Sequence, residues 1–304
     1  MDSPVLIIHP GALGDVLQAV PALRDLRAAI PGTRLVFAGQ PRLGRLLVEL
    51  AVADEARSFD GLGLETLFSD AAVPAPLAGL LARSARVVSW FGSRDATYAR
   101  RLRELAADAT IAAPVPDDDT PVWRHLLRSL GGAATPVAER VAPLVLPPAL
   151  VEAGRRAAPD RPLVVHPGSG GAWKRWPVER IAEVIERLRR LRSFDVLIHQ
   201  GPADADAARA LLAHAGSERV SLLIEPELPL LAGVLTAGRA YLGSDSGVSH
   251  LAAAVGAPTV VLFPPATRRR WAPWSPTAVP IEITGGADEM ETVIRELATK
   301  TSAD

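Results

Sequence analysis

One short segment occurs twice in this chain, about half a chain length apart. Val5–Gly11 (VLIIHPG) reappears as Pro162–Gly168 (PLVVHPG), 157 positions later in a chain of 304 residues. Each copy is an apolar run that stops at proline and enters a glycine-containing loop, and helical sequence follows. Because a strand, a tight loop and a helix in this order open a doubly wound α/β domain, the repeat predicts two related domains.

The rest of the chain continues this alternation of short apolar runs and amphipathic segments, which is typical of parallel sheets covered by helices on both faces. Strands are predicted at Val5–Ile8, Arg34–Ala38, Arg86–Ser89, Thr110–Ala112, Leu163–His166, Phe194–Ile198, Val220–Leu223, Arg239–Leu242 and Thr259–Phe263. Helices are predicted at Leu17–Ile30, Ala96–Leu105, Val122–Leu130, Val178–Leu191, Ala205–His214, Leu228–Ala237 and Ser246–Val255. The proline-rich run Ala142–Pro148 is the expected linker, so we predict domains at 1–148 and 149–304.

Composition excludes several classes of function. The 33 Lys and Arg nearly balance the 34 Asp and Glu, which argues against bulk binding of nucleic acid. Without cysteine the chain has no disulfide, no thiolate metal site and no cysteine nucleophile. The N-terminal sequence lacks the basic flank of a signal peptide, and no apolar run is long enough to span a bilayer, so a cytoplasmic location is expected.

The loop after the first predicted strand places a carboxylate beside two glycines. Gly11 and Gly14 allow a tight turn and leave Asp15 near the start of a helix. Asp15 is either an N-terminal cap or a general base presented to a ligand, and the spacing alone favours the cap. The loop lacks the G-x-G-x-x-G spacing, which disfavours an NAD-dependent oxidoreductase.

The loop of the second repeat has the composition of a phosphate-binding site. Ser169 and Gly170 belong to a run of small residues, and Lys174 and Arg175 follow just before a helix expected to start at Pro177. Lys174 is one of only two lysines in the chain, the other being Lys300. Since no Ser or Thr follows the lysine, this is not a Walker A loop.

A third polar cluster lies where a predicted strand meets a helix. Asp245, Ser246 and Gly247 would stand at the start of that helix, where free N–H groups favour an anion such as a diphosphate, and His250 follows one turn later. The order Gly-x-Ser-x-Gly at 243–247 also suggests a hydrolase, but no acid follows in hydrolase order. Asp117–Asp119 could be taken for a metal site, although capping of the next helix is a sufficient explanation.

Together these three segments resemble glycosyltransferase family 9, the ADP-heptose:lipopolysaccharide heptosyltransferases. The resemblance rests on Leu6–Pro31, Val164–Leu188 and Ala240–Phe263, while Pro264–Trp271 departs from the family pattern and Leu62–Arg103 shows no similarity. It implies the α/β GT-B fold, in which two Rossmann-like domains face each other across a central cleft. The N-terminal domain would then bind the acceptor and the C-terminal domain the nucleotide sugar.

The resemblance also implies a role for each site residue. Asp15, in the loop of Gly11 and Gly14, corresponds to the catalytic base, and Lys174 to the lysine that neutralises the donor diphosphate. The other donor-binding positions are Ser169 and Gly170 in the phosphate loop, Asp204 near the nucleoside, Asp245 at the sugar hydroxyls, and Ser246, Gly247 and His250 at the helix start.

The implied reaction is an inverting sugar transfer that needs no metal or other cofactor. The donor would carry a heptose-like sugar linked to ADP, and the acceptor would be an anionic lipopolysaccharide-type or other cell-envelope glycan or glycolipid. Such an enzyme would be cytoplasmic, with peripheral contact to the inner membrane surface. The alternative is a catalytically inactive GT-B scaffold that binds nucleotide sugars.

Overall fold

The computed structural model describes residues 3–132 and 136–302. The chain divides into two compact units, Met1–Arg140 and Val141–Asp304, and each is described by itself. The predicted boundary at residue 148 falls eight residues later than this division. The difference arises because the proline-rich segment packs on the second unit: Leu144 and Leu146 are buried, and the Leu144 N–H donates to the Ala254 carbonyl at 2.7 Å.

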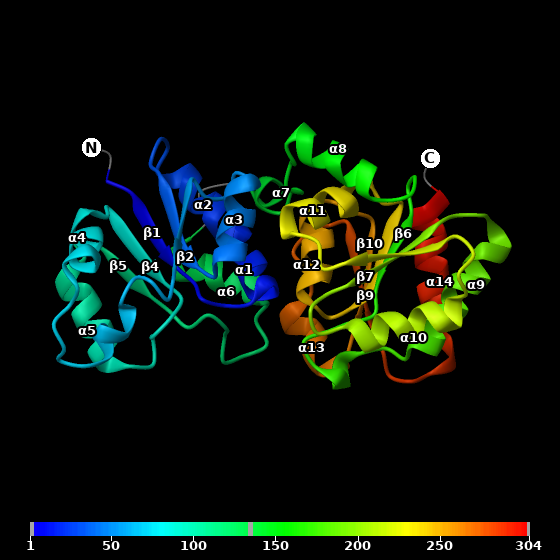
Figure 1. Ribbon diagram of the computed structural model, residues 1–304. Coiled ribbons are helices and arrows are strands. Elements are labelled where there is room, and N and C mark those ends of the chain that lie inside the picture. The colour runs from blue at the N-terminus through cyan, green and yellow to red at the C-terminus, as the bar shows by residue number, and fades with distance from the viewer. Residues whose placement is uncertain (1–2, 133–135, 303–304) are drawn as a thin grey trace. The chain divides into compact units, whose positions relative to one another are not determined.

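The first unit is built on a parallel sheet (Figure 1). Its strands in the described residues are β1 (Val5–Ile8), β2 (Leu35–Gly39), β3 (Glu55–Ser58), β4 (Arg86–Ser89) and β5 (Ala109–Ile111), in the order β3-β2-β1-β4-β5. In register, Val5 of β1 pairs with Leu35 of β2 and Arg86 of β4. The repeated segment therefore forms the central strand, whose carboxyl end opens into the loop that carries Asp15.

Helices cover both faces of this sheet, because the central strands are apolar on both sides. They are α1 (Leu13–Gln18), α2 (Val20–Ala29), α3 (Pro41–Glu49), the 3₁₀ turn η1 (Leu64–Phe68), α4 (Ala75–Arg83), α5 (Ala96–Leu105), α6 (Val122–Ser129) and α7 (Val137–Arg140). Leu6 and Ile8 point into a core shared with α4, α5 and η1, in which Tyr98 and Leu102 are fully buried. Ile7 and Phe37 alternate with them and lie on the opposite face of the sheet.

The second unit repeats the architecture with one more strand. Its parallel strands are β6 (Leu163–His166), β7 (Val196–Gln200), β8 (Val220–Ile224), β9 (Ala240–Ser244), β10 (Thr259–Phe263) and β11 (Ala278–Glu282), in the order β11-β10-β9-β6-β7-β8. Counted from β6, this is the strand order of a dinucleotide-type Rossmann domain, whose topological switch lies between β6 and β9. The loops that carry Lys174 and Asp245 follow these two neighbouring strands.

The helices of the second unit form a layer on each face of the sheet (Figure 1). They are α8 (Pro148–Ala157), η2 (Ala172–Lys174), α9 (Val178–Leu191), α10 (Ala205–Ala215), α11 (Leu228–Ala237), α12 (Gly247–Ala254), α13 (Pro265–Trp271) and α14 (Ala287–Ser302). One core joins α9, α10 and α14 to β6 through residues such as Leu163 and Val165. α8 crosses α11 in backbone contact, because a Cβ on Gly233 would lie 2.1 Å from the Leu150 carbonyl oxygen.

The predicted core elements are confirmed, with a few local corrections. The predicted helix Leu17–Ile30 is two helices, α1 and α2, since Pro21 has no N–H to continue the first one. Pro177 is the N-cap of α9 and not its first residue. The edge strands β3 and β11 were not predicted, nor were α3, α4, α7, α8, α13 and α14.

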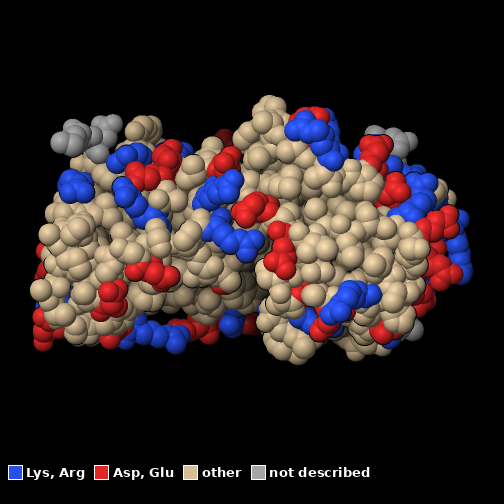
Figure 2. Space-filling model, in the orientation of Figure 1, with Lys and Arg blue, Asp and Glu red and all other residues tan. Residues whose placement is uncertain are grey.

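The surface carries no dominant charge on the face seen in Figure 2, where acidic and basic side chains are interspersed. Among residues 3–132 and 136–302, no helix combines the length and the apolar character needed to cross a membrane.

Candidate active site

Asp15 is held at the start of α1 by a backbone hydrogen bond. Ala12 is the N-cap of this helix and Asp15 is its third residue, so Asp15 caps the helix from inside its first turn and not from the N-cap position. The carboxylate accepts a hydrogen bond from the N–H of Ala12 at 2.8 Å. This is the reciprocal half of a capping box, and alanine has no side-chain acceptor to supply the other half. The side chain is partly exposed, so it can meet a ligand.

His9 lies beneath this loop as a buried neutral imidazole. Its Nδ1 accepts a hydrogen bond from the Gly11 N–H at 3.3 Å, and its ring packs edge-on against Trp90 at 5.6 Å between centroids. Burial lowers the pKa of His9 to about 4, and a hydrogen bond with the backbone of Asp15 offsets only part of that effect. A Cβ on Gly11 would lie 2.7 Å from both His9 and Asp15, so only glycine fits between them.

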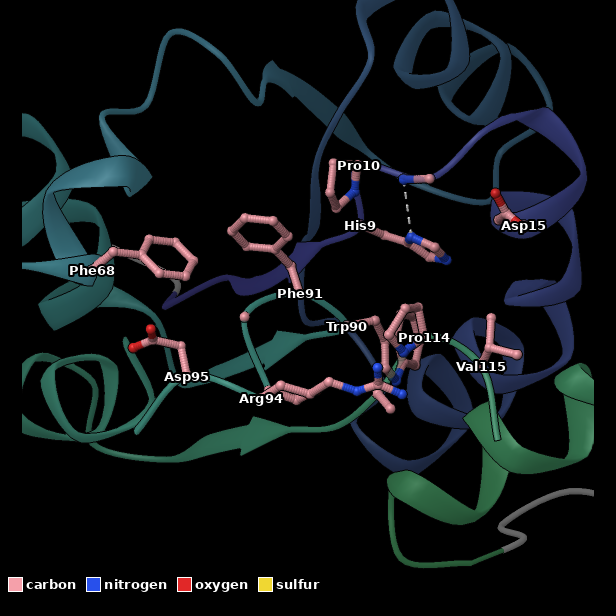
Figure 3. Close-up of a pocket in the computed structure, with 14 residues that line it drawn as sticks. His9, Pro10, Asp15, Phe68, Trp90, Phe91, Arg94, Asp95, Pro114 and Val115 are labelled. Carbon is pink, nitrogen blue, oxygen red and sulfur yellow. Dashed lines mark hydrogen bonds between the residues drawn. The ribbon is translucent and has the colours of Figure 1, made fainter. Parts of the chain in front are cut away.

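His9 and Asp15 both line a pocket of about 780 Å³ at the carboxyl ends of β1, β4 and β5 (Figure 3). The lining residues are His9, Pro10, Gly11, Asp15, Phe68, Trp90, Phe91, Gly92, Ser93, Arg94, Asp95, Ala113, Pro114 and Val115. Ligands of open α/β sheets bind at this end of the strands, and the volume suits a small molecule.

In the second unit, the fold brings Lys174, Asp245 and His250 together. Lys174 Nζ donates to Asp245 Oδ2 at 2.8 Å, and Asp245 Oδ1 lies 3.9 Å from His250 Nε2. The side chain of Asp245 is only 5% exposed and that of Lys174 is 23% exposed. Burial lowers the pKa of His250 to about 4, so it stays neutral beside the ion pair.

The helix that follows this cluster begins as the sequence predicts. Ser246 is the N-cap of α12 and Gly247 its first residue, and the Ser246 hydroxyl accepts a hydrogen bond from the Ser249 N–H at 3.3 Å. Ser249 Oγ in turn donates to the Ser244 carbonyl at 2.6 Å and contacts the Tyr241 hydroxyl at 2.9 Å. This network fixes the helix N-terminus, whose N–H groups and dipole favour an anion.

The glycine-rich loop between β6 and α9 lies next to the same cluster. The Ser169 hydroxyl donates to the Gly171 carbonyl at 2.6 Å, so it holds the loop in shape. Gly170 is exposed, and a Cβ placed on it would meet nothing within 4 Å. The loop is tied to β9 by a hydrogen bond from the Trp176 N–H to Ser244 Oγ at 3.1 Å.

Asp204 belongs to a buried cluster under this loop. Its carboxylate lies 3.7 Å from His166 Nε2 and 3.6 Å from a guanidinium nitrogen of Arg175. A Cβ on Gly168 would lie 2.1 Å from Asp204 Oδ1, so the carboxylate is packed against the loop backbone. These contacts support the phosphate loop, and the contact of Asp204 with a nucleoside stays a prediction.

The family model described as glycosyltransferase family 9 (heptosyltransferase) matches residues 75–296, which include the second and third sequence motifs. The chain belongs to glycosyltransferase family 9. It is similar to lipopolysaccharide heptosyltransferase 1 of Pseudomonas aeruginosa, with 29% identity over 86% of this chain and 78% of that protein. This membership makes the chain a glycosyltransferase.

Solved structures of heptosyltransferases have the same fold as this glycosyltransferase. The structure of E. coli ADP-heptose lps heptosyltransferase II superposes with a TM-score of 0.74 at 19% identity and covers 98% of both chains. E. coli heptosyltransferase WaaC with ADP gives a TM-score of 0.68 at 18% identity, over 97% of this chain and 99% of that chain. The predicted GT-B fold with two Rossmann-like domains is thereby confirmed.

Sequence reasoning found most of the polar residues of the site but missed several others. His9, His166 and Arg175 stand inside the recognised motifs, yet only the burial of the two histidines and the contact of Arg175 with Asp204 reveal that they brace the loops. The aromatic lining of the first-unit pocket, Phe68 and Phe91, comes from Leu62–Arg103, where we expected no similarity to the family. The family model corrects this expectation from residue 75 onward, so its match includes Phe91 but not Phe68. Asp117, from the acidic run, pairs with Arg94 at 3.2 Å. Within the described part of the chain, no group of three or more His, Cys, Asp or Glu side chains is arranged to hold a metal.

Proposed function

We propose that this glycosyltransferase moves a heptose-like sugar from an ADP-linked donor to a lipopolysaccharide-type or other cell-envelope glycan, with inversion at the anomeric carbon. The observation that carries the proposal is the pairing of Lys174 with Asp245 beside the N-terminus of α12. It unites a cation and N–H donors for a diphosphate with a carboxylate for sugar hydroxyls. The relatives named as heptosyltransferases, and the similar structure with ADP, favour the same donor class.

The proposed reaction is a single displacement. A hydroxyl oxygen of the acceptor bonds to the anomeric carbon while the bond from that carbon to the diphosphate oxygen breaks, and the hydroxyl proton passes to the Asp15 carboxylate. Negative charge develops on the departing diphosphate, and Lys174, the N–H groups of Gly170 and Gly247, and the α12 dipole would stabilise it. Ser169 and Asp204 would keep the phosphate loop in shape, and His250 would support Asp245.

We propose further that no metal cofactor takes part, because Lys174 and the helix N-terminus supply the positive potential that a divalent ion would provide. One structural neighbour is described as an iron-containing heptosyltransferase, TibC, so this point needs a direct test. We also propose a cytoplasmic location with peripheral contact to the inner membrane surface, where a glycolipid acceptor would be met.

The decisive experiment is calorimetric titration with ADP, UDP, GDP and CDP, each with magnesium and with EDTA, followed by transfer assays with ADP-heptose. We expect ADP to bind most tightly in either condition, and Lys174→Ala to weaken that binding about tenfold or more. Lys300→Ala is the matched control, since its ammonium donates only to the Thr277 carbonyl in the described structure. Preference for another nucleotide would discard the ADP assignment, and binding without any transfer would favour the inactive scaffold.

A further inference from the structure

The pocket beside Asp15 has an aromatic wall whose residues belong to none of the three sequence motifs. Phe68 ends η1 and Phe91 follows β4, and their rings meet edge-to-face with centroids 5.5 Å apart (Figure 3). Tyr98 packs against both, at 4.8 Å from Phe68 and 5.5 Å from Phe91, and Phe59 packs on Phe91 at 4.9 Å. The wall is therefore held in place before any ligand arrives.

This wall remains accessible although its members are large and apolar. Phe68 is 37% exposed and is among the few large hydrophobic side chains that are exposed in the described part of the chain. Gly92, at φ +68°, lets the chain pass directly over Tyr98, because a Cβ there would lie 2.4 Å from the ring. Ligand pockets are lined mainly by hydrophobic and aromatic side chains, so an accessible aromatic wall in this pocket suits a ligand contact.

The charges around the pocket argue against an anionic ligand. Asp15 and Asp95 contribute two carboxylates, whereas Arg94 is the one Arg or Lys among the described lining residues. The Arg94 side chain is 85% exposed and is already paired with Asp117 at 3.2 Å. His9 adds no charge, because burial lowers its pKa to about 4. A phosphate or carboxylate in this pocket would face two carboxylates and a single arginine, which already pairs with Asp117.

The nearby basic helix α5 does not change this balance. Arg100 pairs with Glu104 at 2.9 Å and lies 3.8 Å from Asp70. Arg101 donates to the carbonyls of Thr66 at 2.8 Å and Ala71 at 2.6 Å, so it ties η1 to α5 and supports Phe68. Arg100 and Arg101 therefore serve the local structure, while Arg103 is exposed in the last turn of the helix and does not line the pocket.

We propose that the acceptor group bound in this pocket is an uncharged saccharide, whose apolar C–H face stacks on Phe68 and Phe91 while a hydroxyl is presented to Asp15. The C–H bonds of a sugar ring carry partial positive charge, which matches the negative face of an aromatic ring. The pocket of about 780 Å³ can hold such a group. This inference rests on the proposed function of Asp15, and it places any phosphate of a glycolipid acceptor outside the pocket.

The test compares neutral and charged saccharides in binding and in transfer. Ligand-observed NMR with methyl glycosides of common hexoses and heptoses, and with their 6- or 7-phosphates, measures occupancy without donor or catalysis. We expect the neutral glycosides to bind more tightly than their phosphates. Phe68→Ala should weaken that binding about fivefold to tenfold, and Phe68→Tyr should retain it.

Val48→Ala is the matched control, because Val48 has the same 37% exposure on α3 but does not line the pocket. In transfer assays, Phe68→Ala should raise the acceptor KM with little change in kcat or in ADP affinity. Tighter binding of the phosphates, or equal binding by Phe68→Ala and the parent chain, would overturn the uncharged acceptor. Failure of every donor in transfer, with no nucleotide bound, would instead overturn the proposed function.

Discussion

The pair formed by Lys174 and Asp245 allows a sharp test of whether the lysine binds the donor diphosphate. Two substitutions, Lys174→Ala and Asp245→Asn, and their combination form a double-mutant cycle. If the ammonium serves the diphosphate as proposed, Asp245 competes with that ligand for the same Nζ. Lys174→Ala should then weaken ADP binding about tenfold or more, while Asp245→Asn should leave ADP affinity unchanged or improve it up to about tenfold.

The expected effect on stability follows from distance and burial. At 2.8 Å the attraction between unit charges is about 6 kcal/mol for an effective dielectric constant near 20. Removal of the nearly buried Asp245 from water, and the ordering of the lysine side chain, offset much of this. A net coupling of about 2 kcal/mol is the expected remainder, as for other hydrogen bonds between charged groups.

The assay is urea unfolding followed by tryptophan fluorescence, together with calorimetric titration of ADP on all four proteins. Lys174→Ala alone should cost about 2–3 kcal/mol, since it leaves Asp245 buried without its cation. The double variant should be less destabilised than the sum of the two single ones. A coupling below about 0.5 kcal/mol, or equal losses of ADP affinity in both single variants, would refute the reasoning.

Three further outcomes are expected. Asp15→Asn should lower turnover about a hundredfold or more while nucleotide affinity stays intact, and unchanged turnover would remove Asp15 from the mechanism. Burial holds the pKa of His9 and His250 at about 4 and that of His199 at about 3, all below the unfolded value of 6.5. The unfolded chain therefore binds more protons, so the free energy of unfolding should be greatest above pH 6.5 and fall toward pH 4, by about 1.4 kcal/mol per pH unit for each histidine. Urea titrations at pH 7, 6 and 5 measure this slope. His250→Asn should reduce the slope by about 1.4 kcal/mol per pH unit, the contribution of one histidine. Gly233→Val should cost about 3 kcal/mol or more in the same assay, because its side chain would strike the backbone of α8, whereas Gly170→Ala, in open space, should cost under about 1 kcal/mol.

The sequence predicts the interior strands of each sheet and the edge strands β5 and β8, but not the edge strands β3 and β11. β1, β4, β6 and β10 lie at their predicted residues, because strands buried on both faces are continuous apolar runs. The edge strand β3 reads Glu-Ala-Arg-Ser and is partly exposed, so its pairing with β2 leaves no apolar pattern to recognise. β11 contains Pro280, which has no N–H to donate to a neighbouring strand; an edge strand tolerates it, but it weakens the strand pattern in the sequence.

The candidate site likewise contains residues that the sequence identified and residues that it did not. Lys174, Asp245, Ser246, Gly247 and His250 were all identified from motifs, because chemistry requires particular residue types there. Their roles stay predictions, and Asp15 lies outside the residues that the family model matches. Phe68 and Phe91 belong to none of the three motifs, and the sequence does not show whether a single aromatic residue packs in a core or lines a pocket.

By itself the sequence determined two βα repeats, the loops that end their first strands, and the residue types those loops present. Such features are local, because a strand, a glycine turn and a helix start each depend on neighbours within a few positions. Only the tertiary structure decided that β6 pairs with β9, which sets Lys174 against Asp245 across 71 positions of chain. It also decided that Phe68 and Phe91 share one wall beside Asp15, because the positions of these loops depend on the packing of the whole sheet and its helices.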